Sequence, residues 1–204
     1  MPLPIDVDAI VQLQADAVEQ WHRGPIANPY TDFMQLVCQQ HEHNYRLWHQ
    51  EDIARAKDVS DAEIAQVKRN IDGLNQKRND WIEKLDDSIT LLLAQQGVET
   101  AEGAPINTET SGSAIDRLSI MSLRLYHYEE QLERDDASDE HRELVTQRIE
   151  LCRQQQGDLS NSLKELLVDL FAGRKAHRTY RQMKMYNDPT LNPYLYAAQK
   201  LRAG

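Results

Sequence analysis

Apolar residues recur every three or four positions along most of this 204-residue chain, the spacing that gathers them on one face of an α-helix. The longest run begins with Ile64, Val67, Ile71 and Leu74 and keeps this spacing as far as Leu92. The eight glycines and seven prolines fall almost entirely between such runs, and no β pattern remains. The pattern therefore predicts an all-α fold.

Breaks in the periodicity divide the chain into six predicted helices, at about residues 6–22, 31–57, 60–96, 113–134, 139–172 and 174–186. The third and fifth are long, and the third would measure about 55 Å at a rise of about 1.5 Å per residue. Short connections favour antiparallel neighbours, so we expect an antiparallel bundle of about five to six helices. We expect a single domain with an N-terminal helix and linker at 1–30, a helical core at 31–186 and an irregular C-terminal arm at 187–204.

Residues typical of helix ends support these boundaries. N-caps are expected at Thr31 or Asp32, at Ser60 with Glu63 in a capping box, and at Ser113 with Asp116. Gly97 is expected to end the third helix. The polar stretch 97–112 that follows is predicted to be a loop, and a loop of that length is usually functional or mobile.

Charge is distributed unevenly along the chain. The net charge is −10, yet residues 174–204 hold seven Lys or Arg and one acid, so this segment carries +6 and residues 1–173 carry −16. Such asymmetry indicates either an anion-binding end or a contact between basic tail and acidic body. The acidic body argues against a general nucleic-acid binder, which needs a broad basic face.

The composition favours a cytoplasmic protein. Mean hydropathy is −0.68, and no run of 18 apolar residues is present to span a bilayer. Residues 1–6 lack the basic and apolar regions of a signal peptide. The two cysteines, Cys38 and Cys152, are too few for a disulfide framework and fit no metal motif, so they are expected to be buried, reduced side chains.

The second predicted helix is unusual because polar residues continue its apolar stripe. Phe33 and Val37 begin the stripe, and the same face then carries His41, Asn44, Trp48, Glu51 or Asp52, and Arg55. Burying such groups without partners costs about 1–3 kcal/mol each. The face therefore borders a cavity or meets a matching polar stripe on another helix.

Two further helices offer polar rows that could meet it. The third carries Lys68, Asp72, Asn75, Asn79, Glu83 and Asp86, with Arg78 interrupting its apolar stripe. The fourth carries Asp116, Ser119, Leu123, His127 and Glu130. Rows converging from three helices could build a ligand site in the bundle core. Two alternatives remain: solvated faces with ion-pair ladders, or a buried network that fixes helix register.

Known catalytic and metal motifs are absent from the sequence. It contains His49-x-x-Asp52 and His127-x-x-Glu130, in which the order is reversed. It does not hold the two E-x-x-H pairs, one on each of two helices, of a ferritin-like di-iron centre, which excludes that centre. No zincin, nucleotide-binding or nucleophile-elbow motif occurs. We therefore predict no protein metal-ligand set. Oxygen ligands for Mg²⁺ are nevertheless available on Glu51, Asp52, Asp72 or Asp86.

The basic segment is the second chemical signal. Arg174, Arg178 and Arg181 would share one face of the predicted helix 174–186. Guanidinium groups suit phosphate or carboxylate, so this face could hold an anion. The alternative is that these arginines pair with the acidic body of the same or a neighbouring subunit.

Four segments resemble, in order, one bacterial family, the domain of unknown function numbered 4254. They are CQQHEHNYRLWHQEDIAR at 38–55, KRNIDGLNQKRND at 68–80, NTETSGSAIDRLSI at 107–120 and YRQMKMYNDP at 180–189. Thr108 and Ser111 depart from the Ser and Pro expected there. The resemblance spans about residues 31–193 and implies a link to envelope polysaccharide synthesis, hence to sugar or sugar-phosphate chemistry. It transfers no catalytic residue.

Two functions are compatible with these observations. The first is a binder of, or an enzyme acting on, an anionic ligand of the phosphorylated sugar or nucleotide-sugar type, in a site roofed by the 97–112 loop. His41, Glu51 and Asp52 would then supply acid–base or Mg²⁺ chemistry. The ligand-binding residues would be Asn44, Trp48, Arg55, Asp72, Asn75, Arg78, Asn79, Asp116, Arg117, Arg178 and Arg181. The second is a non-enzymatic scaffold whose polar rows are structural networks. A homodimer is expected under either.

Overall fold

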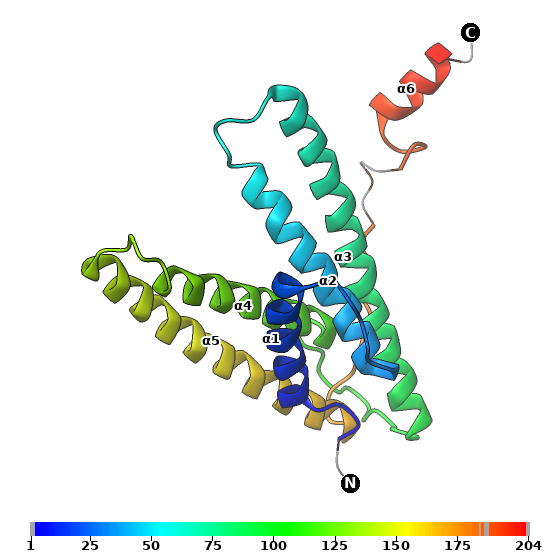
Figure 1. Ribbon diagram of the computed structural model, residues 1–204. Coiled ribbons are helices and arrows are strands. Elements are labelled where there is room, and N and C mark those ends of the chain that lie inside the picture. The colour runs from blue at the N-terminus through cyan, green and yellow to red at the C-terminus, as the bar shows by residue number, and fades with distance from the viewer. Residues whose placement is uncertain (1–2, 184, 186–187, 203–204) are drawn as a thin grey trace.

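The computed structural model describes the backbone of residues 3–183, 185 and 188–202, and confirms the all-α prediction. Six α-helices and no strand occur within these residues (Figure 1). They are α1 (Val7–Arg23), α2 (Asp32–Ile53), α3 (Asp61–Gln95), α4 (Ser111–Leu132), α5 (Asp139–Phe171) and α6 (Pro193–Arg202). The two longest, α3 and α5, are the two predicted to be long.

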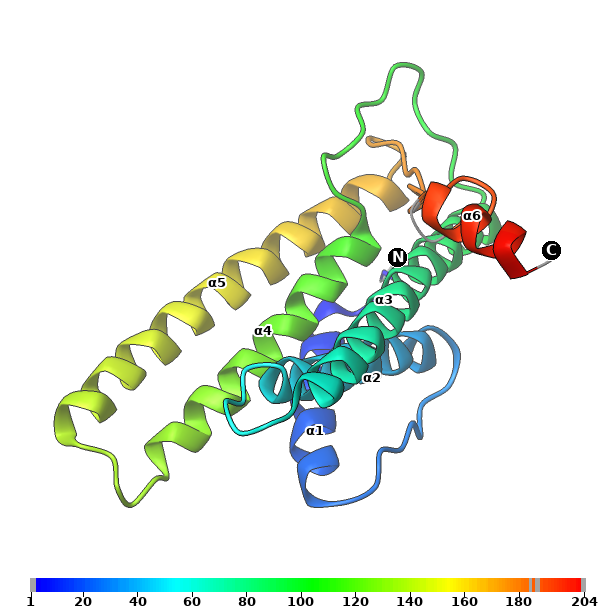
Figure 2. The same cartoon turned by 90° about the horizontal axis from the view of Figure 1, so that it is seen from above.

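The helices form two antiparallel hairpins that meet at an angle. Figure 1 shows the α2–α3 hairpin rising from the point where it meets the α4–α5 hairpin, with α1 in the angle between them. Helix α1 contacts α2, α4 and α5, and α4 contacts both α2 and α3. Figure 2, seen from above, shows the α4–α5 pair running beside the α2–α3 pair. The far ends of both hairpins project from this junction.

The hydrophobic core lies at the junction. Helix α1 buries one face, including Ile10, Leu13 and Trp21. These side chains belong to one apolar cluster with residues from the C-terminal half of α3, the N-terminal half of α4 and the C-terminal half of α5. Burying each aliphatic side chain stabilises the fold by about 1.5–3 kcal/mol, so the junction fixes how the two hairpins are placed.

Most of the predicted helix ends are found near their expected positions. Ser60 accepts a hydrogen bond from the Glu63 backbone N–H at 3.3 Å, as expected for the cap of α3. That helix ends at Gln95, just before Gly97, whose φ is 64°. The fourth helix begins earlier than predicted, because Thr110, and not Ser113, is its N-cap and accepts from the Ser113 N–H at 3.1 Å.

The prediction of a basic helix at 174–186 is wrong over the residues that the structure describes. Residues 174–183, here called the basic strap, contain no helix. The Ala176 N–H donates to the Pro105 carbonyl at 3.0 Å, and Ala176 forms a parallel bridge with Ile106. At Ala176 the strap backbone therefore pairs with the 97–110 loop, whereas a helix would pair it with a residue four positions earlier. Residues 184 and 186 of the predicted helix lie outside the described part.

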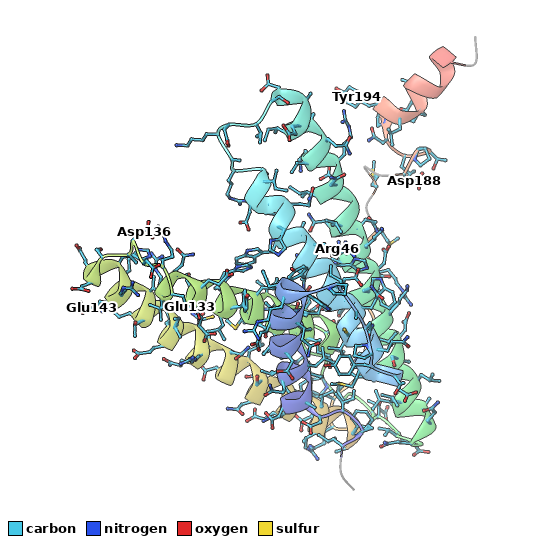
Figure 3. All side chains as sticks on the ribbon, in the orientation of Figure 1. Arg46, Glu133, Asp136, Glu143, Asp188 and Tyr194 are labelled. Carbon is cyan, nitrogen blue, oxygen red and sulfur yellow. The ribbon has the colours of Figure 1, made fainter. Side chains whose placement is uncertain are left out.

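The C-terminal arm is also more regular than predicted, since it contains α6. Pro193 occupies the first helical turn, where its missing N–H is not needed, and the Tyr194 N–H donates to Asn192 Oδ1 at 3.0 Å. Figure 1 shows α6 standing apart from the other helices, and Figure 3 shows Tyr194 and Asp188 on this segment. In the described residues, no helix has both the length and the apolar character needed to cross a membrane.

Candidate functional site

Asp116 is the centre of a polar network between α2, α3 and α4. The residue is 3% exposed. Arg78 donates to both of its carboxylate oxygens, from Nε at 2.7 Å and from Nη2 at 2.5 Å. Gln40 and Asn44 on α2 donate to Oδ1 at 2.6 and 2.9 Å. Four hydrogen bonds from two helices thus compensate the burial of this carboxylate.

Ser119, one turn after Asp116, extends the network to His41. The His41 Nδ1 lies 2.6 Å from the Ser119 hydroxyl, to which Asn44 also donates at 2.8 Å. His41 has no exposed surface and stacks on Trp21 with ring centroids 5.2 Å apart. Burial lowers the pKa of His41 to about 3, so its ring is neutral at physiological pH. Ser119 links it to Asn44 and thereby to the rest of the network.

The predicted convergence is therefore found for part of the rows on the second and fourth helices, whereas the third helix contributes Arg78, which interrupts its apolar stripe, and no member of its polar row. His41, Asn44, Arg78, Asp116 and Ser119 meet, and they bond largely with one another. The half-buried Asn75 and Asn79 contribute no hydrogen bond to this network. Pairing of this kind is what a register-setting network requires. The network also has an open edge, where Asn44 and Arg78 border a cleft.

The cleft has a volume of about 380 Å³ and lies in the angle between the α2–α3 hairpin and α4. Helix α2 supplies most of its wall, α3 supplies Arg78, and α4 supplies Ile120 and Leu123. The cleft residues are Asn44, Leu47, Trp48, Glu51, Asp52, Arg55, Arg78, Ile120 and Leu123. Six of these nine were predicted from sequence as site residues.

The charged groups of the cleft differ in how firmly they are held. Arg55 pairs with Glu51 at 2.7 Å, and the two side chains are 70% and 41% exposed. Arg78 is only 24% exposed and is held by Asp116, a hydrogen bond that raises its pKa. Asp52 forms no ion pair with any described residue. An exposed pair such as Glu51–Arg55 is worth about 0–1 kcal/mol, so a ligand can replace either partner.

The remaining predicted ligand-binding residues lie away from the cleft. Asp72 pairs with Lys68 at 2.9 Å and Arg117 with Glu109 at 2.9 Å, all on the surface. Arg181 in the basic strap pairs with Glu83 at 3.1 Å and Asp87 at 2.8 Å. These contacts support the alternative in which the basic segment pairs with the acidic body of the same chain.

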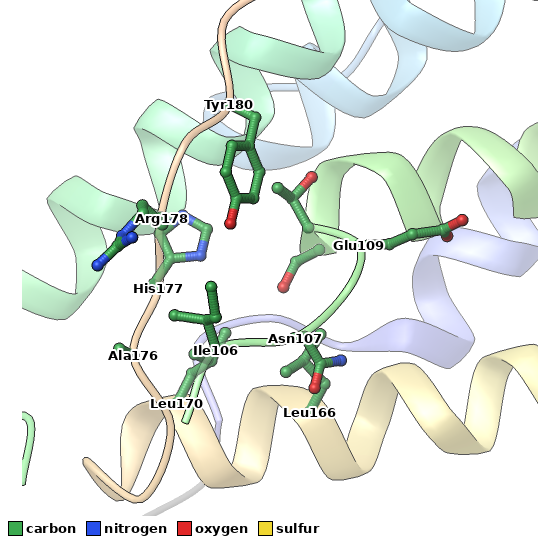
Figure 4. Close-up of a pocket in the computed structure, with 11 residues that line it drawn as sticks. Ile106, Asn107, Glu109, Leu166, Leu170, Ala176, His177, Arg178 and Tyr180 are labelled. Atoms are coloured by element: carbon green, nitrogen blue, oxygen red, sulfur yellow. The ribbon is translucent and has the colours of Figure 1, made fainter. Parts of the chain in front are cut away.

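The 97–110 loop does not roof the cleft. It packs against the basic strap and the end of α5, where Ile106, Asn107, His177, Arg178 and Tyr180 surround a pocket of about 10 Å³ (Figure 4). That volume holds about one water molecule, so the pocket is too small for a metabolite. The loop and the strap therefore close on each other, which places Arg178 outside the cleft.

The four carboxylates predicted as Mg²⁺ ligands do not come together. Glu51 and Asp52 both line the cleft, whereas Asp72 is exposed in the N-terminal half of α3. Asp86 is 1% exposed and accepts from the Gly112 N–H at 2.7 Å, at the start of α4. Burial raises the pKa of Asp86. Only Glu51 and Asp52 remain as a shared oxygen-ligand pair.

A group that the sequence did not single out is a cluster of three histidines, His22, His49 and His127. One ring nitrogen of each lies within 4.8 Å of those of the other two. The cluster joins the end of α1 to α2 and α4, and Trp48 of the cleft stacks on His127 at 4.8 Å with the rings inclined by 9°. Burial, then the neighbouring His22 and His127, lower the pKa of His49.

The profile of the family described as a protein of unknown function, DUF4254, matches residues 34–179. That range covers well over half of the chain. The chain belongs to the DUF4254 family. No curated protein and no solved structure matches it.

The part shared with the DUF4254 family runs from the first turn of α2 into the basic strap. It contains all nine cleft residues and the whole Asp116 network, together with His49 and His127. His22 on α1 precedes it. Sequence reasoning missed His22, although the Glu19-x-x-His22 spacing in α1 was a signal that could have drawn attention to it. His49 and His127 were visible only as members of polar rows.

Proposed function

We propose that this DUF4254 protein binds a small anionic ligand of the phosphorylated sugar or nucleotide-sugar type in the cleft. The observation that carries the proposal is the composition of the cleft wall. An indole and three aliphatic side chains stand beside two arginines, two carboxylates and an amide. Small-molecule sites are mostly apolar with a few polar groups that fix orientation, and this wall has that character.

The apolar part of the cleft suits the face of a sugar ring. Leu47, Ile120 and Leu123 join Trp48 there. The parallel stack of Trp48 on His127 holds the indole plane in place, so a ring that packs on it meets a fixed surface. The C–H groups of a sugar would contact this surface while its hydroxyls face the polar residues.

The polar part suits a phosphate and hydroxyls. Arg55 exchanges its weak pair with Glu51 for the stronger, bidentate geometry that a phosphate offers. Arg78 uses Nε and Nη2 for Asp116, which leaves Nη1 without a bond to any described residue. Asp52, with Asn44, would accept and donate hydrogen bonds to the hydroxyls.

If the protein is an enzyme, Glu51 and Asp52 are the residues placed to transfer protons or hold Mg²⁺, because both line the cleft. The sequence predicted acid–base or Mg²⁺ chemistry for His41, but in this proposal His41 does not touch the ligand. His41 is completely buried and fixes Ser119 and Asn44, so it would act as a positioning residue.

Replacing Arg55 tests the proposal directly. Arg55→Gln removes the phosphate partner from the cleft, and we expect the affinity for a sugar phosphate to fall about 10- to 100-fold, the equivalent of about 1.5–3 kcal/mol for a charge-assisted bond. Calorimetry or thermal shift with sugar phosphates, nucleotide sugars and the corresponding unphosphorylated sugars measures this. A ligand at about 100 times its Kd adds about 2.7 kcal/mol of stability.

Arg46 provides the matched control. It forms the same type of pair, with Glu42 four residues earlier at 2.7 Å, within α2 and not just beyond its end, and it does not line the cleft. Arg46→Gln should therefore leave binding unchanged. Equal losses in the two variants, or a panel that produces no shift with the wild-type protein, would refute the proposal.

A second function, a homodimeric scaffold, is favoured by two observations. The residues of the Asp116 network bond with one another, and the C-terminal segment, here the end of the basic strap together with α6, exposes apolar side chains. Met183 and Tyr194 are each 87% exposed, and α6 stands apart from the bundle (Figure 1). We propose that this segment forms a homodimer whichever function holds, because exposed apolar side chains mark interaction surfaces. We also propose a cytoplasmic location, since Cys38 and Cys152 are buried free thiols. A place in envelope polysaccharide metabolism is a further part of the proposal.

A further inference from the structure

The histidine cluster brings three imidazoles together from three helices. Ring centroids lie 5.1 Å apart for His22 and His49, 5.2 Å for His22 and His127, and 5.7 Å for His49 and His127. Each pair meets edge to face, at 67°, 78° and 85°. The three rings therefore surround a common point instead of forming one stack.

Two of the rings have their tautomers fixed by outer hydrogen bonds. His22 Nδ1 lies 2.7 Å from the Val18 carbonyl, and His127 Nδ1 lies 2.7 Å from a carboxylate oxygen of Glu130. Both partners only accept, so each Nδ1 carries the proton. The neutral ring then presents a lone pair at Nε2. This pairing of an outer acceptor with an inner lone pair is the usual arrangement around a metal-binding histidine.

The inner atoms have no partner within the protein. Nε2 of His22, of His49 and of His127 is buried and forms no hydrogen bond with any described residue. Buried acceptors that converge without a donor are unfavourable, because they lose water and gain nothing in exchange. Aromatic stacking with Trp48 or Tyr126 accounts for the ring planes, but not for the common direction of the Nε2 atoms.

We propose that His22, His49 and His127 bind one divalent transition-metal ion of the Zn²⁺ class through their Nε2 atoms. Neutral imidazoles suit Zn²⁺, Co²⁺, Ni²⁺ or Cu²⁺, whereas Mg²⁺ prefers oxygen ligands. The proposed ligand set is independent of the cleft proposal. It leaves one tetrahedral position open to water or a substrate, as in catalytic zinc sites with three histidines.

The spacing of the three atoms is close to what such an ion requires. Zn–N bonds of about 2.0–2.1 Å place tetrahedral ligand atoms about 3.3 Å apart. The ligand atoms here lie within 4.8 Å of one another. Side-chain rotations that move each ring inward by about 1 Å close the difference.

Metal titration of the full chain tests the proposal. The protein is stripped with a chelator and titrated with Zn²⁺ by calorimetry and with Co²⁺ by visible absorption, which reports tetrahedral coordination. We expect one ion per chain. Loss of an outer hydrogen-bond partner weakens metal binding roughly 10- to 100-fold. Loss of a ligand should weaken Zn²⁺ binding by more than that, and this is expected for each of the variants His22→Gln, His49→Gln and His127→Gln. His141→Gln, at the start of α5, is the matched control and should bind as the wild type does.

A second variant guards against misfolding. Glu130 is 43% exposed and touches the cluster only through His127, so Glu130→Gln keeps the fold and should weaken Zn²⁺ binding about 10-fold. Glu133→Gln, just beyond the end of α4, should have no effect. The proposal is overturned if the stripped wild type binds neither ion, or if the His22→Gln and Glu130→Gln proteins bind as tightly as the His141→Gln protein. Failure of sugar-phosphate binding in the cleft would not affect this result.

Discussion

Asp116 shows how one residue can join three helices. Its carboxylate accepts from Arg78 on α3 and from Gln40 and Asn44 on α2, while its own backbone belongs to α4. Since the carboxylate is almost completely buried, each of these bonds replaces water that the group has lost. The residue therefore couples the stability of the fold to the geometry of the cleft.

Removal of this carboxylate should be costly. Asp116→Ala leaves the half-buried Arg78 guanidinium unpaired, and we expect the free energy of unfolding to fall by about 3–5 kcal/mol. Asp72→Ala removes a carboxylate from an exposed pair with Lys68 and should cost less than about 1 kcal/mol. Urea denaturation of both variants checks this. Similar losses in the two proteins would contradict the assignment of Asp116 as the centre of the network.

His41 makes stability depend on pH. The unfolded chain binds its proton near pH 6.5, whereas the folded chain does so only near pH 3, because burial disfavours the charged ring. Between pH 3 and pH 6.5 the unfolded state binds more protons than the folded state. The stabilisation that the neutral, buried His41 ring contributes to the free energy of unfolding is therefore fully present above pH 6.5 and is lost as the pH falls below it. The expected slope is about 1.4 kcal/mol per pH unit.

Because this slope applies only below pH 6.5, His41 should lower the free energy of unfolding by about 1.4 kcal/mol in total between pH 7.5 and 5.5, which chemical denaturation at the two pH values measures. The lowered pKa values of His43 and His49 act in the same direction, and the raised pKa of Asp86 acts in the opposite one. A His41→Gln variant keeps these groups and lacks only the His41 proton. Its stability should fall less between the two pH values than that of the wild type, and an unchanged slope would show that His41 is not the cause.

At the scale of elements, the start of α4 lies unusually close to α3. A Cβ on Gly112 would lie 2.6 Å from the Ile82 carbonyl oxygen and 2.9 Å from Asp86 Oδ1. The Gly112 N–H also donates to Asp86, which places a carboxylate at the positive end of the α4 dipole. The absence of a side chain at this position therefore allows the two hairpins to meet.

A pair of glycine substitutions tests this contact. Gly112→Ala should destabilise the protein by about 1–3 kcal/mol, because the obstructing atom is backbone and one helix must move. In the middle of α5, a Cβ on Gly157 meets nothing within 4 Å. Gly157→Ala should instead stabilise the protein by about 0.5–1 kcal/mol through helix propensity. Thermal unfolding of the two variants should give shifts of opposite sign.

At the scale of the whole molecule, the two hairpins diverge and the cleft lies in the angle between them. Figure 3 shows Asp136 and Glu143 at the far end of the α4–α5 hairpin, well away from the junction. Only the junction is tied together by the core and the Asp116 network. The geometry of the cleft therefore depends on how the junction packs, and not on the hairpin ends.

The proposed homodimer also belongs to this scale. Light scattering of the wild type should give twice the chain mass of 23.6 kDa. Replacing both Met183 and Tyr194 with Ser removes the two most exposed apolar side chains of the C-terminal segment and should give the monomer mass. A wild-type monomer, or a dimer that survives the double substitution, would exclude this interface.

The sequence by itself determined the all-α class, the two long helices, the Ser60 cap, the family and six of the nine cleft residues. The family follows from the four matching segments. The other properties depend on neighbours three or four positions apart, and residues such as Asn44, Trp48 and Asp52 fall on one face of α2 through helical periodicity alone. The same local rule failed at the basic strap. There the Ala176 N–H bonds to Pro105, a residue far away in sequence.

Only the tertiary structure decided which polar rows meet. Asn44 and Asp116 are 72 positions apart, and His41 and Ser119 are 78 apart, so no spacing rule links them. The same holds for His22, which meets His49 and His127 because α1 packs into the angle between the hairpins (Figure 1). Periodicity specifies the face of a helix, but burial of the apolar faces specifies which faces meet, and that depends on the whole chain.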